Sequence, residues 1–150
     1  MSEPVILFVC TGNICRSPIA EFMLKGKLGP HTDWDIKSAG IAAYTGSPAS
    51  EMAIKVMEEK GVKMSGHRSQ PVTRELIDEA SLIVVMTASH SEQLLEHYPR
   101  AREKIFRMKS FDNKNPAGDI DDPIGATTET YRKVRSQIEA AMPGLISFMN

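Results

Sequence analysis

Several features that mark whole classes of protein are missing from this 150-residue chain. The formal net charge is −1, so no basic surface for binding nucleic acid is expected. No apolar run approaches the roughly 20 residues that cross a bilayer, which argues against a membrane segment. The N-terminus lacks the basic stretch of a secretory signal peptide, and the apolar run at residues 5–9 is too short for its core. These absences predict a cytoplasmic protein.

Cysteine is also scarce, with only Cys10 and Cys15. Two cysteines this close in a short loop make a poor structural disulfide, and a cytosolic disulfide is more often redox-linked. The chain has no CxxC pair and no clustered histidine and cysteine ligands, so we expect no metal site and no cofactor. It also has no repeats and no low-complexity linker, and its 41% hydrophobic content suits a single domain over residues 1–150.

What the chain does contain is an alternation of short apolar runs with segments of helical periodicity. Strands that alternate with helices form right-handed βαβ units. The expected fold class is α/β, a small doubly wound four-stranded parallel sheet with helices on both faces and the flavodoxin-like strand order 2-1-3-4. We expect strands at 5–9, 34–39, 81–86 and 104–108, and helices at 17–28, 50–60, 73–80, 89–97 and over the last part of the chain, which Pro143 should kink or interrupt.

The connection between the first strand and the first helix carries the clearest chemistry. Residues 10–17 read Cys-Thr-Gly-Asn-Ile-Cys-Arg-Ser. Backbone N–H groups in such a loop point at one spot, which the helix dipole makes suitable for a phosphate. These donors and Arg16 favour the reactive thiolate of Cys10, and the guanidinium fork matches two phosphoryl oxygens. The sequence therefore predicts that Cys10 attacks phosphorus and forms a phosphocysteine, which water later hydrolyses.

Neighbouring residues suit the same loop. Gly12 and Asn13 tolerate left-handed backbone angles, which a loop that turns its N–H groups inward requires. Ser17 can donate a hydrogen bond to Cys10 Sγ and help the thiolate to leave in the second step. His31, His90 and His97 belong to no motif, and we expect them at the surface.

A general acid has to come from elsewhere in the chain. The polar loop before the last helix offers Asp119, Asp121 and Asp122. Pro123 restricts the backbone of Asp122 to an extended conformation. Asp122 is our candidate for the acid that protonates the leaving group and the base that activates water, with Asp121 as the fallback.

Cys10 to Ser17, followed by Pro-Ile-Ala-Glu at 18–21 and much later by Asp122-Pro123, resembles the low-molecular-weight protein-tyrosine phosphatase family over essentially the whole chain. The resemblance implies phosphorylated protein substrates, and we expect a monomer or weak homodimer. It also implies a reversible disulfide between Cys10 and Cys15, and a hydrogen bond between His67 and Asn13. Cys10, Arg16 and Asp122 would be catalytic, with phosphate binding and loop support from Thr11, Gly12, Asn13, Ile14, Cys15, Ser17 and His67.

The substrate is less clearly marked. Within the family Ile14 accompanies phosphotyrosine specificity, whereas threonine at that position accompanies phosphoarginine. Against this, Ile124 stands where tyrosine-specific members carry an aromatic residue, and Thr87 resembles the arginine phosphatase branch. We expect Tyr44 and Ile124 to line the substrate slot and phosphotyrosine to be the substrate. Protein-arginine phosphatase, arsenate reductase with an external thiol, and binding of phosphorylated partners without hydrolysis are the alternatives.

Overall fold

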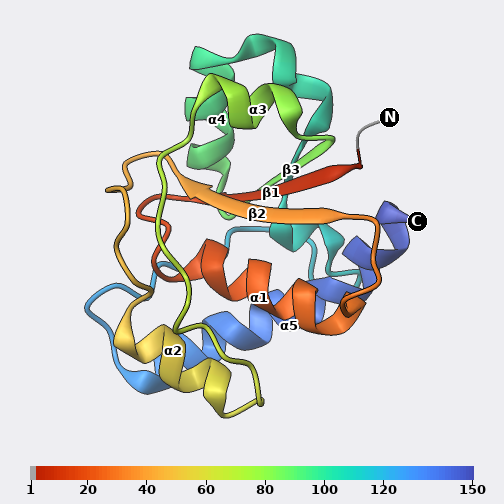
Figure 1. Cartoon of the computed structure of the whole chain (residues 1–150). Coiled ribbons are helices and arrows are strands. Elements are labelled where there is room, and N and C mark those ends of the chain that lie inside the picture. The colour runs from red at the N-terminus through yellow and green to blue at the C-terminus, as the bar shows by residue number, and fades with distance from the viewer. Residues whose placement is uncertain (1–2) are drawn as a thin grey trace.

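The computed structural model describes residues 3–150, and a four-stranded sheet forms its centre (Figure 1). The strand order is β2-β1-β3-β4, and all three neighbouring pairs are parallel. This arrangement confirms the predicted α/β class and the 2-1-3-4 order. The strands are β1 (Val5–Cys10), β2 (Asp35–Gly40), β3 (Leu82–Val85) and β4 (Ile105–Arg107).

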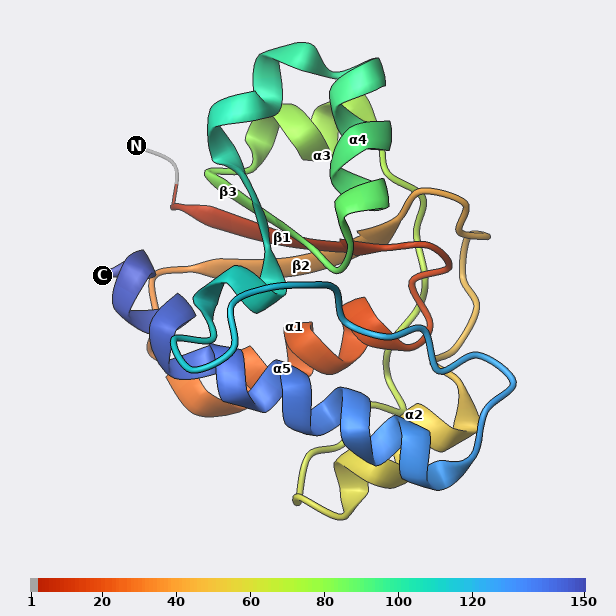
Figure 2. The same cartoon turned by 180° about the vertical axis from the view of Figure 1, so that it is seen from behind.

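Helices cover both faces of the sheet, as Figures 1 and 2 show. One layer contains α1 (Arg16–Leu28), α2 (Glu51–Glu58) and α5 (Thr128–Met149), and the other contains α3 (Arg74–Glu79) and α4 (Ala88–His97). Two 3-10 helices, η1 (Pro99–Lys104) and η2 (Met108–Phe111), flank β4. None of the helices within residues 3–150 is long and apolar enough to cross a membrane.

The alternation of side chains along β1 divides the core between the two faces of the sheet. Ile6 and Phe8 pack into the cluster shared with α1 and α5, whereas Leu7 and Val9 pack into the cluster under α3 and α4. All four side chains are fully buried. A parallel strand with both faces covered requires such a continuous apolar run, which explains why β1 shows no polar alternation.

The predicted interruption of the last helix at Pro143 is wrong, because α5 continues to Met149, whereas the predicted kink stays a prediction. Pro143 lies on the exposed face of the helix, where the carbonyl that its missing N–H leaves unpaired can face water. The next residue, Gly144, faces η2 instead. A Cβ added at this position would lie 2.1 Å from the carbonyl oxygen of Phe111. A glycine at this position lets α5 approach η2 and cover the end of the sheet.

Candidate active site

The loop between β1 and α1 lies at the carboxyl end of the central strand β1, and the segment after β2 holds it from behind. The backbone N–H of Ile41 donates to Cys10 O, and that of Ala42 donates to Thr11 O, each at 2.9 Å. A Cβ on Gly40 would lie 2.5 Å from Thr11 O, so the close approach requires a residue without a side chain. The loop is therefore fixed by strand pairing that continues past the end of the sheet.

Within the loop Asn13 adopts a left-handed conformation with φ 56°, as its residue type predicted. Gly12 does not, so the prediction that it supplies a positive φ is wrong; it keeps a conformation open to other residues. The backbone oxygen of Asn13 lies 2.7 Å from Nε2 of the buried His67, the contact that the family resemblance implies. One left-handed residue, held by a histidine from the segment between α2 and α3, turns the loop.

The Asn13 side chain gives the hydrogen bonds behind the thiol a definite direction. Its Oδ1 accepts from the backbone N–H of Gln70 at 3.0 Å, which fixes the orientation of the amide. Its Nδ2 donates both to Ser38 Oγ at 2.9 Å and to Ser17 Oγ at 2.8 Å. Ser38 in turn donates to the carboxylate of the buried Glu21, which can only accept.

The direction of these hydrogen bonds decides which atom donates to Cys10. Its Sγ lies 2.9 Å from Ser17 Oγ, and its side chain is buried. Because Ser17 Oγ already accepts from Asn13, the serine hydroxyl hydrogen is free to point at sulfur. The network that starts at Glu21 therefore presents a hydroxyl donor to the sulfur of Cys10.

Arg16 joins the loop to a distant segment of the chain. Its guanidinium is buried, and Nη1 donates to the carbonyl of Ile120 at 3.1 Å. Ile120 N in turn donates to Met86 O at 2.9 Å, at the end of β3. As a result, the segment between η2 and α5 runs past the loop between β1 and α1 (Figure 2), and Asp122 Oδ2 lies 3.6 Å from Arg16 Nη2.

The structure separates the three neighbouring aspartates. Asp122 meets Arg16, and its Oδ1 accepts from the backbone N–H of Ile124 at 3.1 Å. Asp121, the fallback acid, faces α5 instead, where it lies 3.4 Å from Lys133 Nζ. Asp119 Oδ1 accepts from the first backbone N–H of α4 at 2.8 Å. Of the three, only Asp122 therefore makes a direct contact with the loop that holds Cys10.

Cys15 lies deeper, on the side of the loop that faces α5. Its Sγ is 3.4 Å from the hydroxyl of Tyr131 and 3.5 Å from Ser50 Oγ, and both cysteines are free thiols. Burial raises the pKa of the Cys15 thiol, and it raises the pKa of Tyr131 to about 12. The two groups form a neutral hydrogen-bonded cluster beneath the loop.

One residue of the site was missed at the sequence level. His90 was expected at the surface, but it is only 3% exposed, and its Nε2 lies 2.9 Å from Thr11 Oγ1. Burial, aided by the nearby guanidinium of Arg16, lowers the pKa of His90 to about 4. The available signal was its spacing from Leu94, since residues four apart share one face of a helix and Leu94 is a core residue. His31 and His97 are exposed as predicted.

The two residues expected to line a substrate slot are both exposed. Tyr44 is 83% exposed, while its backbone is held by Ser69, whose hydroxyl donates to the Tyr44 carbonyl. Ile124 is 57% exposed and follows Asp122 in the same turn. Their exposure leaves both side chains in contact with solvent, and their role in a substrate slot stays a prediction.

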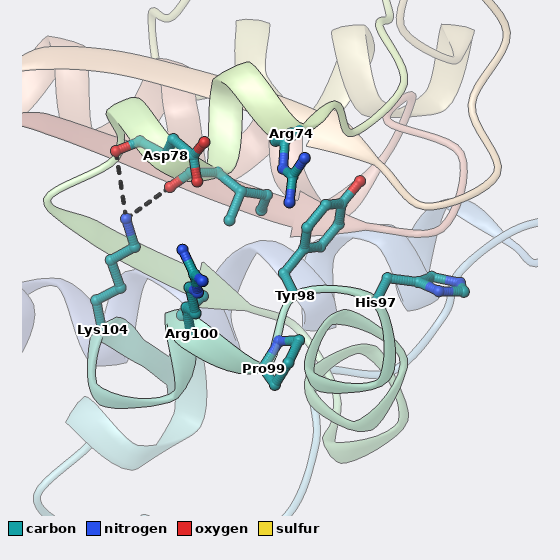
Figure 3. A pocket seen from close by; sticks show the side chains of 9 residues that line it. Arg74, Asp78, His97, Tyr98, Pro99, Arg100 and Lys104 are labelled. Atoms are coloured by element: carbon teal, nitrogen blue, oxygen red, sulfur yellow. Dashed lines mark hydrogen bonds between the residues drawn. The ribbon is translucent and has the colours of Figure 1, made fainter.

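A cavity of about 240 Å³ lies elsewhere, among α3, α4 and η1 (Figure 3). Arg74, Asp78, His97 and Arg100 line it, and none of the loop residues does. Lys104 donates to the carbonyls of two residues near the end of α3, at 2.6 and 2.7 Å, which satisfies that helix terminus. Within residues 3–150 no three His, Cys, Asp or Glu side chains gather as a metal site would require.

Comparisons with known proteins agree with this architecture. The family model of the low molecular weight phosphotyrosine protein phosphatases matches residues 5–150. The chain therefore belongs to this family, and it is a hydrolase that removes phosphate from phosphorylated proteins.

The proteins that this chain is similar to include both arginine phosphatases and tyrosine phosphatases. A protein-arginine-phosphatase of Geobacillus stearothermophilus is 42% identical over 140 residues, covering 93% of this chain and 92% of that protein. The low molecular weight protein-tyrosine-phosphatase Wzb of Escherichia coli K12 is 36% identical over 134 residues, covering 89% and 87%. The structure of the YwlE arginine phosphatase from Geobacillus stearothermophilus superposes with a TM-score of 0.89 at 40% identity, covering 97% of this chain and 92% of that one.

Proposed function

We propose that the protein hydrolyses phosphotyrosine in proteins through a phosphocysteine on Cys10, with Asp122 as general acid and base. One observation carries this proposal, the 3.6 Å approach of Asp122 Oδ2 to Arg16 Nη2. It brings a carboxylate from the far end of the chain to the anion-binding loop. The nucleophile, the hydrogen-bond donor to the phosphate and the proton donor then share one site, which phosphoryl transfer to a thiolate requires.

In the first step the phosphate would bind to the loop N–H groups and to Arg16. The Cys10 thiolate attacks phosphorus in line, and the phosphorus–oxygen bond to the leaving group breaks. Asp122, in its protonated form, gives its proton to that oxygen. The hydroxyl of Ser17 supports the negative sulfur before the attack.

In the second step the roles of Asp122 and Cys10 reverse. The Asp122 carboxylate takes a proton from water, and the oxygen attacks the phosphocysteine. The sulfur–phosphorus bond breaks, inorganic phosphate forms, and the thiolate returns to the hydrogen bond from Ser17. The 2.9 Å contact between Ser17 Oγ and Cys10 Sγ supports this role because it stabilises sulfur as a leaving group.

The features around the rim support phosphotyrosine. Ile14 is apolar and packs against the core cluster beside the loop, and the exposed ring of Tyr44 can contact an aromatic substrate. Thr87, which pointed towards phosphoarginine, uses its hydroxyl to accept from His90 N at 3.1 Å as the N-cap of α4. Aspartate serves equally well at an N-cap, so Thr87 carries little information on the substrate.

Phosphoarginine is the second candidate, and the similarity to a protein-arginine-phosphatase and to an arginine phosphatase structure favours it. The two substrates differ in the group that leaves, an aromatic phenol or a guanidinium, but share the phosphoryl group that the loop would bind. The attack by Cys10 and the phosphocysteine are therefore the same for both, but with phosphoarginine the phosphorus–nitrogen bond breaks and Asp122 gives its proton to the guanidino nitrogen.

The test is to measure turnover of a phosphotyrosine peptide and a phosphoarginine peptide side by side, with Cys10→Ser and Asp122→Ala as inactive controls. Preferred cleavage of phosphotyrosine, lost in both variants, is the expected result. Preferred cleavage of phosphoarginine would keep the mechanism and overturn the substrate. If the wild type cleaves neither, the proposal fails, and reduction of arsenate with an added thiol becomes the next assay.

We further propose that the chain acts as a single domain, as a monomer or weak homodimer, in the cytoplasm, and that Cys10 and Cys15 can form a disulfide. The low net charge supports the absence of a nucleic-acid partner. Sedimentation of the protein and mass spectrometry after mild peroxide treatment test the oligomeric state and the disulfide.

A further inference from the structure

The His90 imidazole lies beneath the edge of the loop and belongs to none of the roles proposed above. It projects from the first turn of α4 and is 3% exposed. Its Nε2 is 2.9 Å from Thr11 Oγ1, and the same oxygen lies 3.5 Å from Arg16 Nη2. Thr11 is therefore the link between a buried histidine and the guanidinium that would bind phosphate.

The tautomer of His90 follows from its second nitrogen. Nδ1 is buried and has no hydrogen-bond partner among residues 3–150. A buried N–H without an acceptor is rarer in proteins than a buried acceptor that goes unused. The hydrogen of the neutral ring is thus assigned to Nε2, which donates to Thr11 Oγ1.

The charge of the ring is set by what faces it. Burial and Arg16 on α1 disfavour the imidazolium, while Asp119 and Asp122 on the loop before α5 favour it, and the balance lowers the pKa of His90 to about 4. The ring is neutral in the pH range where a phosphatase of this kind would work. A second positive charge beside Arg16 is thereby avoided.

Thr11 Oγ1 then receives two donors, the His90 ring and Arg16 Nη2. The opposite branch of the guanidinium, Nη1, donates to the Ile120 carbonyl. Arg16 is consequently contacted at both ends of its fork, and at Nη2 the Thr11 hydroxyl shares the guanidinium with Asp122, whose Oδ2 lies 3.6 Å away. The Arg16 contact is long at 3.5 Å, so it alone does not fix the threonine rotamer, whereas the 2.9 Å contact with His90 does.

We propose that His90 is a positioning residue for phosphate binding: its neutral imidazole fixes Thr11 Oγ1, which in turn keeps the Arg16 guanidinium aimed into the loop. The inference rests on the proposed function, because it assumes that the loop is a phosphate site. It adds a residue from the layer of α3 and α4 to a site otherwise built from β1, β2, α1, the segment between α2 and α3, and the loop before α5.

The test is the dissociation constant of inorganic phosphate, measured by calorimetry on the intact protein. Loss of one hydrogen bond that orients a charged group should weaken binding about five- to tenfold in His90→Leu. His90→Gln, which keeps an N–H donor near the place of Nε2, should recover most of the affinity. His97→Leu is the matched control, the same substitution on an exposed histidine of α4, and should leave the affinity unchanged.

A double-mutant cycle separates positioning from a merely structural role. Thr11→Val should weaken phosphate binding as much as His90→Leu does, and adding His90→Leu to Thr11→Val should have no further effect. Additive losses, or a loss in His90→Leu that His90→Gln does not recover, would overturn the inference. If His90→Leu does not fold, Thr11→Val and His90→Gln still test the inference. Full phosphate affinity in Thr11→Val would overturn the inference.

Calorimetry needs no turnover, so failure of this inference is distinguishable from failure of the proposed function. A wild type that binds phosphate but cleaves no peptide refutes the function while the cycle still tests His90. A wild type that does not bind phosphate refutes both.

Discussion

Gly40→Ala is the sharpest test of how the sheet positions the proposed catalytic loop. Gly40 is the last residue of β2 and pairs with Cys10 across the sheet. An added Cβ would lie 2.5 Å from the Thr11 carbonyl oxygen and 2.9 Å from the Asn13 nitrogen. Both are backbone atoms of the loop, so no flexible side chain can move aside, and the loop itself has to shift.

The magnitude follows from the size of that shift. Carbon and oxygen pack at roughly 3.3 Å or more, so the loop has to move by nearly 1 Å, and a misplacement of this size costs about 100-fold in rate. The same overpacking should destabilise the fold by about 1–3 kcal/mol. The expected result is a fall of about 100-fold in kcat/KM, measured on a general aryl phosphate, with urea unfolding recorded in parallel.

Gly26→Ala is the matched control, because Gly26 is an exposed residue of α1 with nothing within 4 Å of the position its Cβ would take. It should leave kcat/KM unchanged and stabilise the protein by about 0.5–1 kcal/mol through helix propensity. Activity in Gly40→Ala within about threefold of the wild type would refute the argument, since it would mean that the loop tolerates the displacement.

Three further outcomes follow from the structure. Ser17→Ala removes the donor 2.9 Å from Cys10 Sγ and should slow phosphocysteine hydrolysis roughly 10- to 100-fold, measured as the steady-state rate after a burst. Arg132 and its neighbour Arg135 lower the pKa of Glu59 to about 2 from an ordinary value of 4.5, so the stability that this exposed carboxylate contributes is complete above pH 4.5 and is lost as the pH falls towards 2. The difference in urea midpoint between wild type and Glu59→Gln should shrink over that range, and it should be small throughout because the pair is exposed. Tyr131→Phe should destabilise the protein by about 1 kcal/mol in urea unfolding, because it removes the hydroxyl that bonds to Cys15 and Ser50.

Each of these has a contrary outcome. An unchanged steady-state rate in Ser17→Ala would show that the serine hydroxyl does not support sulfur as a leaving group. If the urea midpoints of wild type and Glu59→Gln differ as much at pH 2 as at pH 6, the charge of the Glu59 carboxylate is not the cause of the difference in stability. Full stability in Tyr131→Phe would mean that water replaces the lost hydroxyl beneath the loop.

Much of the fold could be predicted because its signals are local. The unbroken apolar runs of β1 and β3 indicate strands buried on both faces, and the order of strands and helices leaves few ways to connect them. Thr73 was predicted to open a helix, and its hydroxyl accepts from the backbone N–H of Leu76 as the N-cap of α3. The interruption predicted at Pro143 does not occur, because whether a proline ends a helix depends on which face of α5 meets the core.

In the candidate site, too, the contacts between residues close in sequence could be predicted from their spacing, whereas the contacts between distant residues could not. Cys10, Asn13, Arg16 and Ser17 lie within one loop, so their spacing along the chain already fixes which of them can meet. Pro123 favoured Asp122 over Asp121 as the candidate acid, and the folded loop then shows that Asp122 lies near Arg16 whereas Asp121 lies near Lys133.

The sequence alone determined the strands, the helix starts and the loop proposed to bind phosphate, because these depend on side chains and backbone groups a few residues apart. Tertiary structure decided what the loop touches. Arg16 reaches a carbonyl 104 residues away, and Thr11 meets His90, 79 residues away. Such contacts depend on how the crossovers bring α4 and the loop before α5 to the carboxyl edge of the sheet. No local pattern contains that information, because the energy that places them comes from the packing of the whole core.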